Sequence, residues 1–167
     1  MLRPDSATAN APSDLREPYG EDHEPQRMWL RLVSCYHLME MGLRKELRAK
    51  FETTLPRFDL MSQLYRYPDG LKMKDLSRLL LVTCGNITGL TDRLVEDGMV
   101  ERRDNPEDRR AYHVILTAKG RKTFEAMAVD HKRWVGSALA GLAKEDQQRL
   151  SALLNKLKRH LVSQPLP

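Results

Sequence analysis

One stretch of the chain, from Thr83 to Glu96, carries side chains suited to binding a polyanion. Residues with amide, hydroxyl or guanidinium groups alternate there with glycines. The residues are Thr83, Gly85, Asn86, Thr88, Gly89 and Arg93. Amides and hydroxyls can pair with base edges, and a guanidinium can pair with phosphate oxygens. The chemistry that these residues indicate is recognition through hydrogen bonds and charge.

A helix is the element that would position these groups. Apolar side chains and one threonine recur at helical spacing on the side away from them, at Ile87, Leu90, Thr91 and Leu94. The helix should begin near Thr83 and end at Asp97-Gly98, because glycine commonly follows the last helical residue.

Two glycines, Gly85 and Gly89, lie one turn apart on the outward side of this helix. In a helix each costs about 1 kcal/mol relative to alanine. This loss of helix stability is explained if the two glycines let the helix backbone approach a partner closely. The alternative is that the glycines pack against a neighbouring helix.

A basic hairpin should follow the helix. Val100–Arg103 and Ala111–Leu116 are predicted strands, the second with Tyr112, Val114 and Leu116 on one face and His113 and Ile115 on the other. Turn-forming residues 104–108 separate them, with arginines 102, 103, 109 and 110 on either side. Upstream, a shorter helix would support the helix that begins near Thr83, and its inner side would include leucines 71, 76, 79 and 80. The order predicts a winged helix-turn-helix.

Residues 108–117, DRRAYHVILT, match the wing signature D-x-R-x-x-x-V-x-L-T of the multiple-antibiotic-resistance regulator (MarR) family. Residues 85–94 and 97–102 resemble the recognition helix of that family and its exit. The resemblance spans about residues 27–162. It implies a homodimeric bacterial repressor or activator that responds to a small molecule. Such a dimer would bind a near-palindromic operator in double-stranded DNA.

The resemblance also implies roles for single residues. Asn86, Thr88 and Gly89 would face bases in the major groove, beside Gly85, while Thr83 and Arg93 would hold phosphates. Arg110, with Arg109 beside it, matches the wing arginine that enters the minor groove. Asp108 would stabilise the wing, because a carboxylate repels phosphate.

Composition agrees with these expectations. The 167 residues carry a net charge of +5, but residues 1–24 hold six acids and two bases, so that segment is −4 and the remainder is +9. A basic body suits an anionic partner. No apolar run is long enough to span a membrane, and no signal-peptide core is present. Two cysteines make no disulfide framework, so we expect a cytoplasmic protein.

The fold class expected is mainly α with a small β-hairpin wing, in which long N- and C-terminal dimerisation helices flank a winged helix-turn-helix. The predicted regions are a disordered acidic tail (1–24), a helical dimerisation region (25–53 and 118–162), the DNA-binding region (54–117) and a C-terminal tail (163–167). Helices are expected from Pro25 to Phe51, from Thr54 to Arg66, from Thr117 to about Gly141 and from Lys144 to about Val162.

Apolar seams on the first and last helices predict pairing with a second subunit. They are formed by Trp29, Leu32, Tyr36, Leu150, Leu153, Leu157 and Leu161. Core packing within one monomer is the alternative.

An effector pocket is expected where the dimerisation helices meet the DNA-binding lobe, as the family resemblance implies. Its candidate lining is Trp29, Tyr36, His37, Arg57, Phe58, Met61 and Tyr65. Aromatic and thioether surface with a few cations suits a planar organic acid or its thioester. The recognition helix is also similar to those of members that regulate aromatic-acid breakdown, including sensors of aromatic acyl-CoA. The alternative is that these side chains form core.

Other chemistry finds little support in the sequence. No catalytic constellation, cofactor motif or metal-ligand spacing is present, so we expect no enzyme, no cofactor and no metal. His131 lies on an apolar stripe and should be a core histidine. Cys35 lies where peroxide-sensing members carry their thiol, but a buried, inert Cys35 is favoured. The alternative functions are a redox-sensing regulator using Cys35, an effector-independent DNA-binding protein and a helical protein-interaction module.

Overall fold

The computed structural model describes residues 23–105 and 108–164, with the side chains of 104, 105 and 108–111 excepted. The chain divides into two compact units, residues 1–38 and 39–167, and each is described by itself. The acidic tail predicted for residues 1–24 lies outside the described residues, except for its last two positions.

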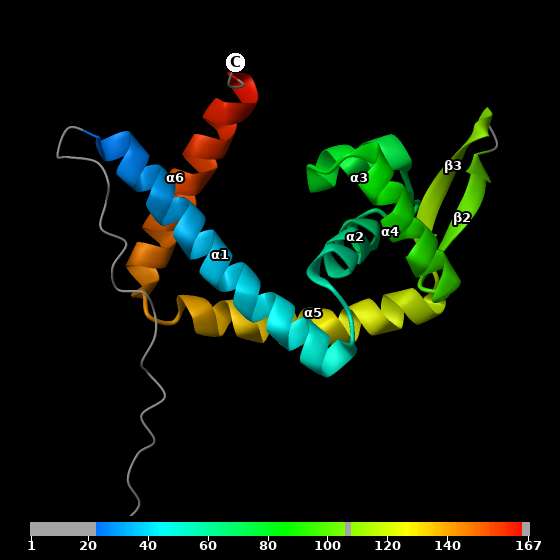
Figure 1. Cartoon of the computed structure of the whole chain (residues 1–167), viewed down its shortest axis with the longest axis horizontal. Coiled ribbons are helices and arrows are strands. Elements are labelled where there is room, and N and C mark those ends of the chain that lie inside the picture. The colour runs from blue at the N-terminus through cyan, green and yellow to red at the C-terminus, as the bar shows by residue number, and fades with distance from the viewer. Residues whose placement is uncertain (1–22, 106–107, 165–167) are drawn as a thin grey trace, which may run out of the picture. The chain divides into compact units, whose positions relative to one another are not determined.

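Six helices and three short strands make up the described chain (Figure 1). In order they are α1 (Glu24–Phe51), α2 (Leu55–Arg66), β1 (Leu71–Lys72), α3 (Met73–Leu80), α4 (Cys84–Glu96), β2 (Val100–Asn105), β3 (Asp108–Leu116), α5 (Ala118–Leu139) and α6 (Lys144–Ser163). The predicted fold class, mainly helical with a small β wing, is confirmed.

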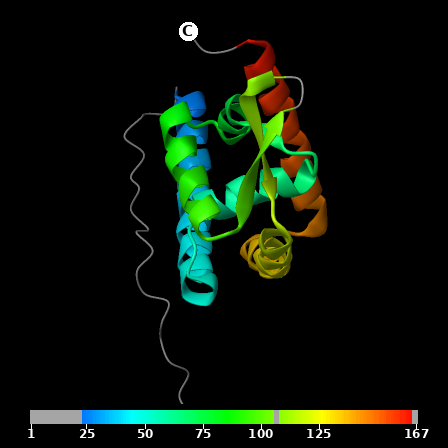
Figure 2. The ribbon, with the colours of Figure 1, turned by 90° about the vertical axis from the view of Figure 1, so that its right-hand side faces the viewer.

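The sheet has three antiparallel strands in the order β1-β3-β2, so the predicted hairpin of β2 and β3 is confirmed and a third strand, β1, was not predicted. The missed strand β1 pairs Leu71 with Val114 and Lys72 with His113. Two residues are too few to show the alternation by which a strand is recognised in a sequence. Figure 2 shows β2 and β3 side by side as a twisted hairpin.

The expected alternation along β3 is also wrong at one position, because Ile115 is buried beside Val114 and Leu116. Gly70, in the turn before β1, covers it. A Cβ on Gly70 would lie 2.5 Å from Cγ2 of Ile115 and 2.9 Å from the carbonyl oxygen of Val114. The backbone of Gly70 has a φ of +90°, which favours glycine. The turn at Gly70 therefore packs closely against the outer face of β3 and buries Ile115.

Aromatic side chains of α2 and α5 form one part of the core of the second unit. Phe58 packs on Phe124, with ring centroids 5.3 Å apart, and Tyr65 packs on Phe124 at 4.9 Å. His131 stacks on Phe58 at 4.5 Å, and burial lowers the pKa of this imidazole below its ordinary value. His131 is therefore held against the core, and its neutral form is favoured there.

The last turns of α1 pack on the middle of α5. Leu47 is fully buried, and Phe51 meets Trp134 edge-on with centroids 6.4 Å apart. The buried carboxylate of Asp130 pairs with Lys50 and with Arg133, the latter at 2.6 Å. A buried charge is tolerated when it is paired in this way.

Candidate nucleic-acid interface

Helix α4 begins as the sequence predicts. Thr83 is its N-cap, and the Thr83 hydroxyl oxygen accepts a hydrogen bond from the backbone N–H of Asn86 at 3.4 Å. Because the hydroxyl acts here as an acceptor, its own proton remains available to donate to another group. The preceding turn places Leu81 in the left-handed region, with φ 55° and ψ 38°, and so reverses the chain between α3 and α4. Together, α3, the turn and α4 form the predicted helix-turn-helix.

The inward face of α4 is also confirmed. Ile87, Thr91 and Leu94 are fully buried, and Leu90 packs against the same core. The buried Thr91 hydroxyl donates to the carbonyl oxygen of Ile87 at 2.8 Å. With its polar group satisfied, Thr91 can serve as a core residue.

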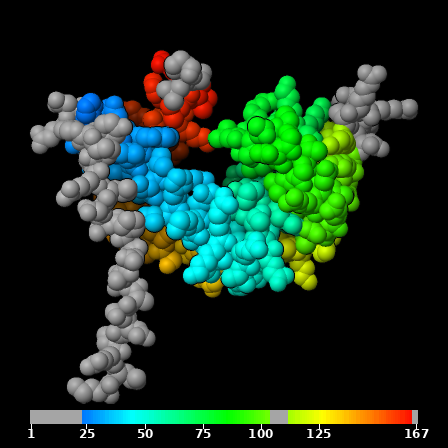
Figure 3. Space-filling model, viewed as in Figure 1, coloured from blue at the N-terminus to red at the C-terminus, as the bar shows by residue number. Residues whose placement is uncertain are grey.

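The outward face of α4 is open at both glycines. A Cβ added to Gly85 or to Gly89 would meet no heavy atom within 4 Å among the residues that the structure places. The alternative that these glycines pack against a neighbouring helix of the described chain is therefore contradicted. Figure 3 shows the green stretch of chain to which α4 belongs at the surface of the molecule.

The polar groups predicted to read DNA lie on this exposed part of α4. Asn86, Thr88 and Arg93 are all exposed. The Thr88 hydroxyl donates to the carbonyl oxygen of Cys84 at 2.9 Å, which leaves its oxygen free to accept. Helix α4 thus combines a bare backbone surface with donors, an acceptor and a cation.

An ion pair that the sequence analysis missed connects α4 to the wing. The carboxylate of Asp92 accepts a hydrogen bond from Arg102 on β2, and this bond raises the pKa of Arg102 above its ordinary value. The Arg102 guanidinium also lies over the ring of Tyr112 on β3, 5.0 Å from its centroid. The pair neutralises a carboxylate that would otherwise repel phosphate, and it fixes the base of the wing to α4.

The wing residues themselves remain predictions. Asp108, Arg109 and Arg110 belong to β3 by their backbone, but their side chains lie outside the described part of the chain. Their proposed contacts with DNA therefore stay untested.

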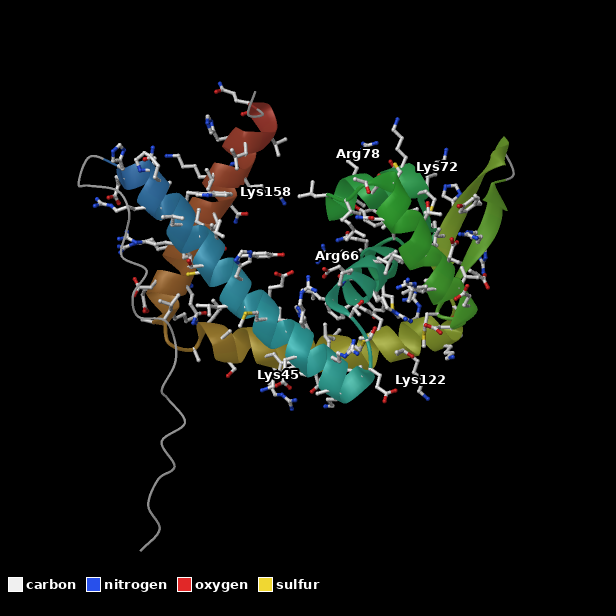
Figure 4. The ribbon with its side chains drawn as sticks, viewed as in Figure 1. Lys45, Arg66, Lys72, Arg78, Lys122 and Lys158 are labelled. Atoms are coloured by element: carbon white, nitrogen blue, oxygen red, sulfur yellow. The ribbon has the colours of Figure 1, made fainter. Side chains whose placement is uncertain are left out.

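Further cations lie beside the helix-turn-helix. Lys72 on β1 and Arg78 on α3 are exposed and point outward in Figure 4, Arg78 with Asp75 at 3.1 Å. In helix-turn-helix proteins whose first helix crosses the DNA backbone, cations in such positions can contact phosphates. Neither residue stands out in the sequence, because isolated basic residues on a polar surface are common.

The candidate effector residues fall in both units. Within the second unit, Phe58 and Met61 are core residues, Arg57 pairs with Asp97, and the Tyr65 hydroxyl donates to Glu125 at 3.1 Å. Trp29, Tyr36 and His37 are exposed on the part of α1 that belongs to the first unit. The burial of Phe58 and Met61 agrees with the core alternative for these two residues, and the pocket stays a prediction.

Both cysteines are exposed, so the expected burial of Cys35 is wrong for this chain. The Sγ atom of Cys84 lies 3.6 Å from the Ser77 hydroxyl. Among the described residues no group of three histidine, cysteine or acidic side chains could hold a metal ion. None of the described helices is long and apolar enough to cross a membrane.

Comparison with known proteins gives one consistent result. The model of the MarR family matches residues 53–112. YkoM of Bacillus subtilis, an uncharacterized HTH-type transcriptional regulator, is 33% identical over 72% of this chain and 77% of its own length. BadR of Rhodopseudomonas palustris, a transcriptional activatory protein, is 29% identical over 80% of this chain and 79% of its own.

Solved structures agree. A MarR family transcriptional regulator from Silicibacter pomeroyi is 32% identical, with a TM-score of 0.72 over 86% of this chain and 99% of its own. Sco3205 of Streptomyces coelicolor, a MarR family regulator solved in complex with DNA, is 26% identical, with a TM-score of 0.76 over 90% and 94% of the two chains.

Proposed function

Because the chain belongs to the MarR family of transcriptional regulators, we propose that it is a homodimeric, sequence-specific repressor that reads double-stranded DNA through α4. The observation that carries this proposal is the open glycine face of α4, flanked by exposed Asn86, Thr88 and Arg93. A related regulator solved in complex with DNA shares the fold over most of both chains.

The proposed reading mode assigns one task to each part of the lobe. Asn86, Thr88 and Gly89 face base edges in the major groove, while Thr83 and Arg93 hold phosphates. Arg110 enters the minor groove, where negative potential is concentrated. Two copies of α4 enter successive major grooves, roughly 34–36 Å apart, on a near-palindromic operator.

Replacing Asn86 with alanine should weaken binding to the preferred duplex by about 1–3 kcal/mol and relax the preference at one base pair. The physical reason is the loss of an amide that can pair with two atoms of one base. Fluorescence anisotropy with duplexes selected from a random pool would measure both effects. Asn155→Ala, at an exposed position of α6, is the matched control and should bind like the wild type. An Asn86→Ala variant with unchanged affinity and unchanged preference would remove Asn86 from the reading surface.

The exposed apolar side chains of the outer helices support the homodimer. Helix α6 has no buried residue in this chain, and Leu153 is 59% exposed. Trp29 on α1 is 65% exposed. Exposed apolar surface of this kind is characteristic of an obligate interface, which typically buries more than about 2,000 Å².

Light scattering should therefore give twice the 19.3 kDa mass of the chain at micromolar concentration. Leu153→Asp should lower that mass or the thermal stability, because it places a carboxylate in the apolar interface. Gln148→Asp, at another exposed position of α6, should do neither. A wild-type protein that is monomeric at micromolar concentration would rule out the permanent dimer.

The proposed signal is a planar organic acid, such as an aromatic acid or its acyl-CoA thioester, that releases the repressor from DNA. Support comes from the residue types among the candidate effector residues, which include Trp29, Tyr36, His37, Arg57 and Tyr65, and from the recognition-helix sequence. BadR is named an activatory protein, so activation on the same DNA-binding fold is the alternative outcome.

An effector needs to favour the state that does not bind DNA by about 100-fold, near 2.7 kcal/mol, to switch a typical site. We expect benzoate, hydroxycinnamate or one of their CoA thioesters to bind in calorimetry and to lower DNA affinity by about this factor. Acetyl-CoA serves as the control without a ring. If none of the four aromatic compounds binds below millimolar concentration, the effector class is wrong and the DNA-binding proposal is unaffected.

A further inference from the structure

The C-terminal end of α4 is held by two cationic side chains from neighbouring helices. Arg57, in the first turn of α2, forms an ion pair with the carboxylate of Asp97, which is the C-cap residue of α4. Lys119, in the first turn of α5, donates to the backbone carbonyl oxygen of Asp97 at 2.8 Å. The helix that presents the DNA-reading residues is therefore tied at one end to both α2 and α5.

Asp97 occupies a position that disfavours a carboxylate in two ways. The C-terminal end of a helix carries partial negative charge, so an acidic side chain there is destabilising. Helix α4 is also the element proposed to approach phosphates, which repel a carboxylate. Neither the helix nor DNA favours an acid at this position, but the ion pair with Arg57 does.

The ion pair with Asp97 is made although another polar atom of Arg57 is left without a hydrogen bond. Its Nε atom is buried and has no hydrogen-bond partner among the residues that the structure describes. An unpaired buried donor is costly, and a terminal guanidinium nitrogen meanwhile reaches Asp97. The observed conformation of Arg57 therefore makes the ion pair with Asp97 and leaves Nε buried, without a hydrogen-bond partner in the described structure.

The chain just beyond Asp97 is fixed by separate contacts to the start of α5. The Thr117 hydroxyl donates to the carbonyl oxygen of Gly98 at 2.7 Å, and the Thr117 N–H donates to that of Met99 at 3.1 Å. These contacts hold the exit of α4 on α5. The ion pair between Arg57 and Asp97 adds the connection to α2, and so constrains how α4 can rotate about that exit.

We propose that Arg57 is a positioning residue for DNA recognition, which acts on the recognition helix through Asp97 and does not itself contact DNA. The proposal rests on the DNA-binding function proposed above. With the pair intact, α4 keeps the orientation that brings Asn86 and Gly89 to the base edges. With the pair broken, the helix samples other orientations, and fewer of them fit the operator.

The Asp97→Asn variant separates this proposal from simple electrostatics by the sign of its effect. If charge alone mattered, removing a carboxylate from a helix near phosphates would tighten DNA binding. Positioning predicts the opposite, a loss of about tenfold in affinity. Glu96→Gln is the matched control, because it removes the same charge one residue earlier from an exposed side chain for which the described residues provide no ion pair. It should bind DNA as tightly as the wild type or slightly more tightly.

Variants of Arg57 complete the experiment, with binding measured by anisotropy over a range of salt concentrations and without effector. Arg57→Gln should also lose about tenfold in affinity while the slope of log affinity against log salt stays at the wild-type value, because no phosphate contact is lost. Arg57→Lys, which keeps the charge, should recover most of the loss. Thermal unfolding midpoints should stay within about 3 °C of the wild type, since partly exposed ion pairs contribute little stability.

Two results would overturn the proposal. One is an Asp97→Asn protein that binds the selected duplex as tightly as Glu96→Gln does. The other is an Arg57→Gln protein whose salt slope falls by about one counterion, which would make Arg57 a phosphate contact. A wild-type protein that binds no DNA would instead overturn the proposed function, and this proposal with it.

Discussion

Gly120→Ala is expected to destabilise the fold by about 3 kcal/mol, because the added methyl group has no room beside the backbone of Met99. Gly120 lies in the first turn of α5, directly against the loop that leaves α4. A Cβ there would lie 1.9 Å from the carbonyl oxygen of Met99 and 2.8 Å from its carbonyl carbon. Both atoms belong to the backbone, so no side chain can move aside and the helix or the loop must shift.

Such a shift would also disturb the Thr117 hydroxyl, which accepts the Gly120 N–H at 2.9 Å and donates to Gly98. Thermal unfolding should show a midpoint lower by about 6–12 °C. Gly136→Ala is the control in the same helix, because an added Cβ there meets nothing within 4 Å in the described structure. It should raise stability by up to about 1 kcal/mol through helix propensity. Equal midpoints for the two variants would contradict the close contact between α5 and the exit of α4.

The second large effect is expected at Gly89, where stability and DNA binding should change in opposite directions. Gly89→Ala adds a methyl group to an exposed helix position with no neighbour within 4 Å. The folded chain should gain up to about 1 kcal/mol of stability. DNA binding should weaken by about 10- to 100-fold, equivalent to about 1.4–2.8 kcal/mol, because the methyl group keeps the helix backbone from the base edges.

Thermal unfolding and anisotropy measured on the same preparation would test this pair of effects. Gly136→Ala again serves as the control, with a similar gain in stability and no change in DNA affinity. A Gly89→Ala protein that is both more stable and as tight a binder as the wild type would show that the glycine face does not approach DNA.

Local signals explain why so much of the lobe could be predicted from the sequence. Helix α4 has the predicted limits because its cap Thr83 and its stop Gly98 act within one turn of the helix ends. Its buried face has the predicted residues because Ile87 and Leu94 are spaced by the helix period itself. Thr117 caps α5 as expected for the same reason.

The errors and omissions depend on contacts between residues far apart in the chain. Ile115 is buried because Gly70 lies over it, and no pattern within β3 could have indicated that cover. The pairs Asp92–Arg102 and Arg57–Asp97 depend on how whole elements meet. Charged residues are frequent throughout the chain, so the sequence offers many possible pairs and no means of choosing among them.

The glycines of α4 show what a local sequence pattern can predict and what depends on the positions of other elements. The sequence placed Gly85 and Gly89 on one outward face, but it allowed either a DNA partner or a neighbouring helix. Only the positions of the other elements could decide, and within the described chain they leave both glycines open. The occupant of that face is the central question for this protein.

Selection of DNA by the wild-type protein from a pool of random duplexes answers that question most directly. We expect enrichment of one near-palindromic sequence whose half-sites are centred about one helical turn apart, 10–10.5 base pairs. The enriched duplex should bind at least about 1,000-fold more tightly than an unselected one at the same salt concentration. Folded protein that enriches no sequence, and binds all duplexes with equal affinity, would contradict sequence-specific recognition by α4.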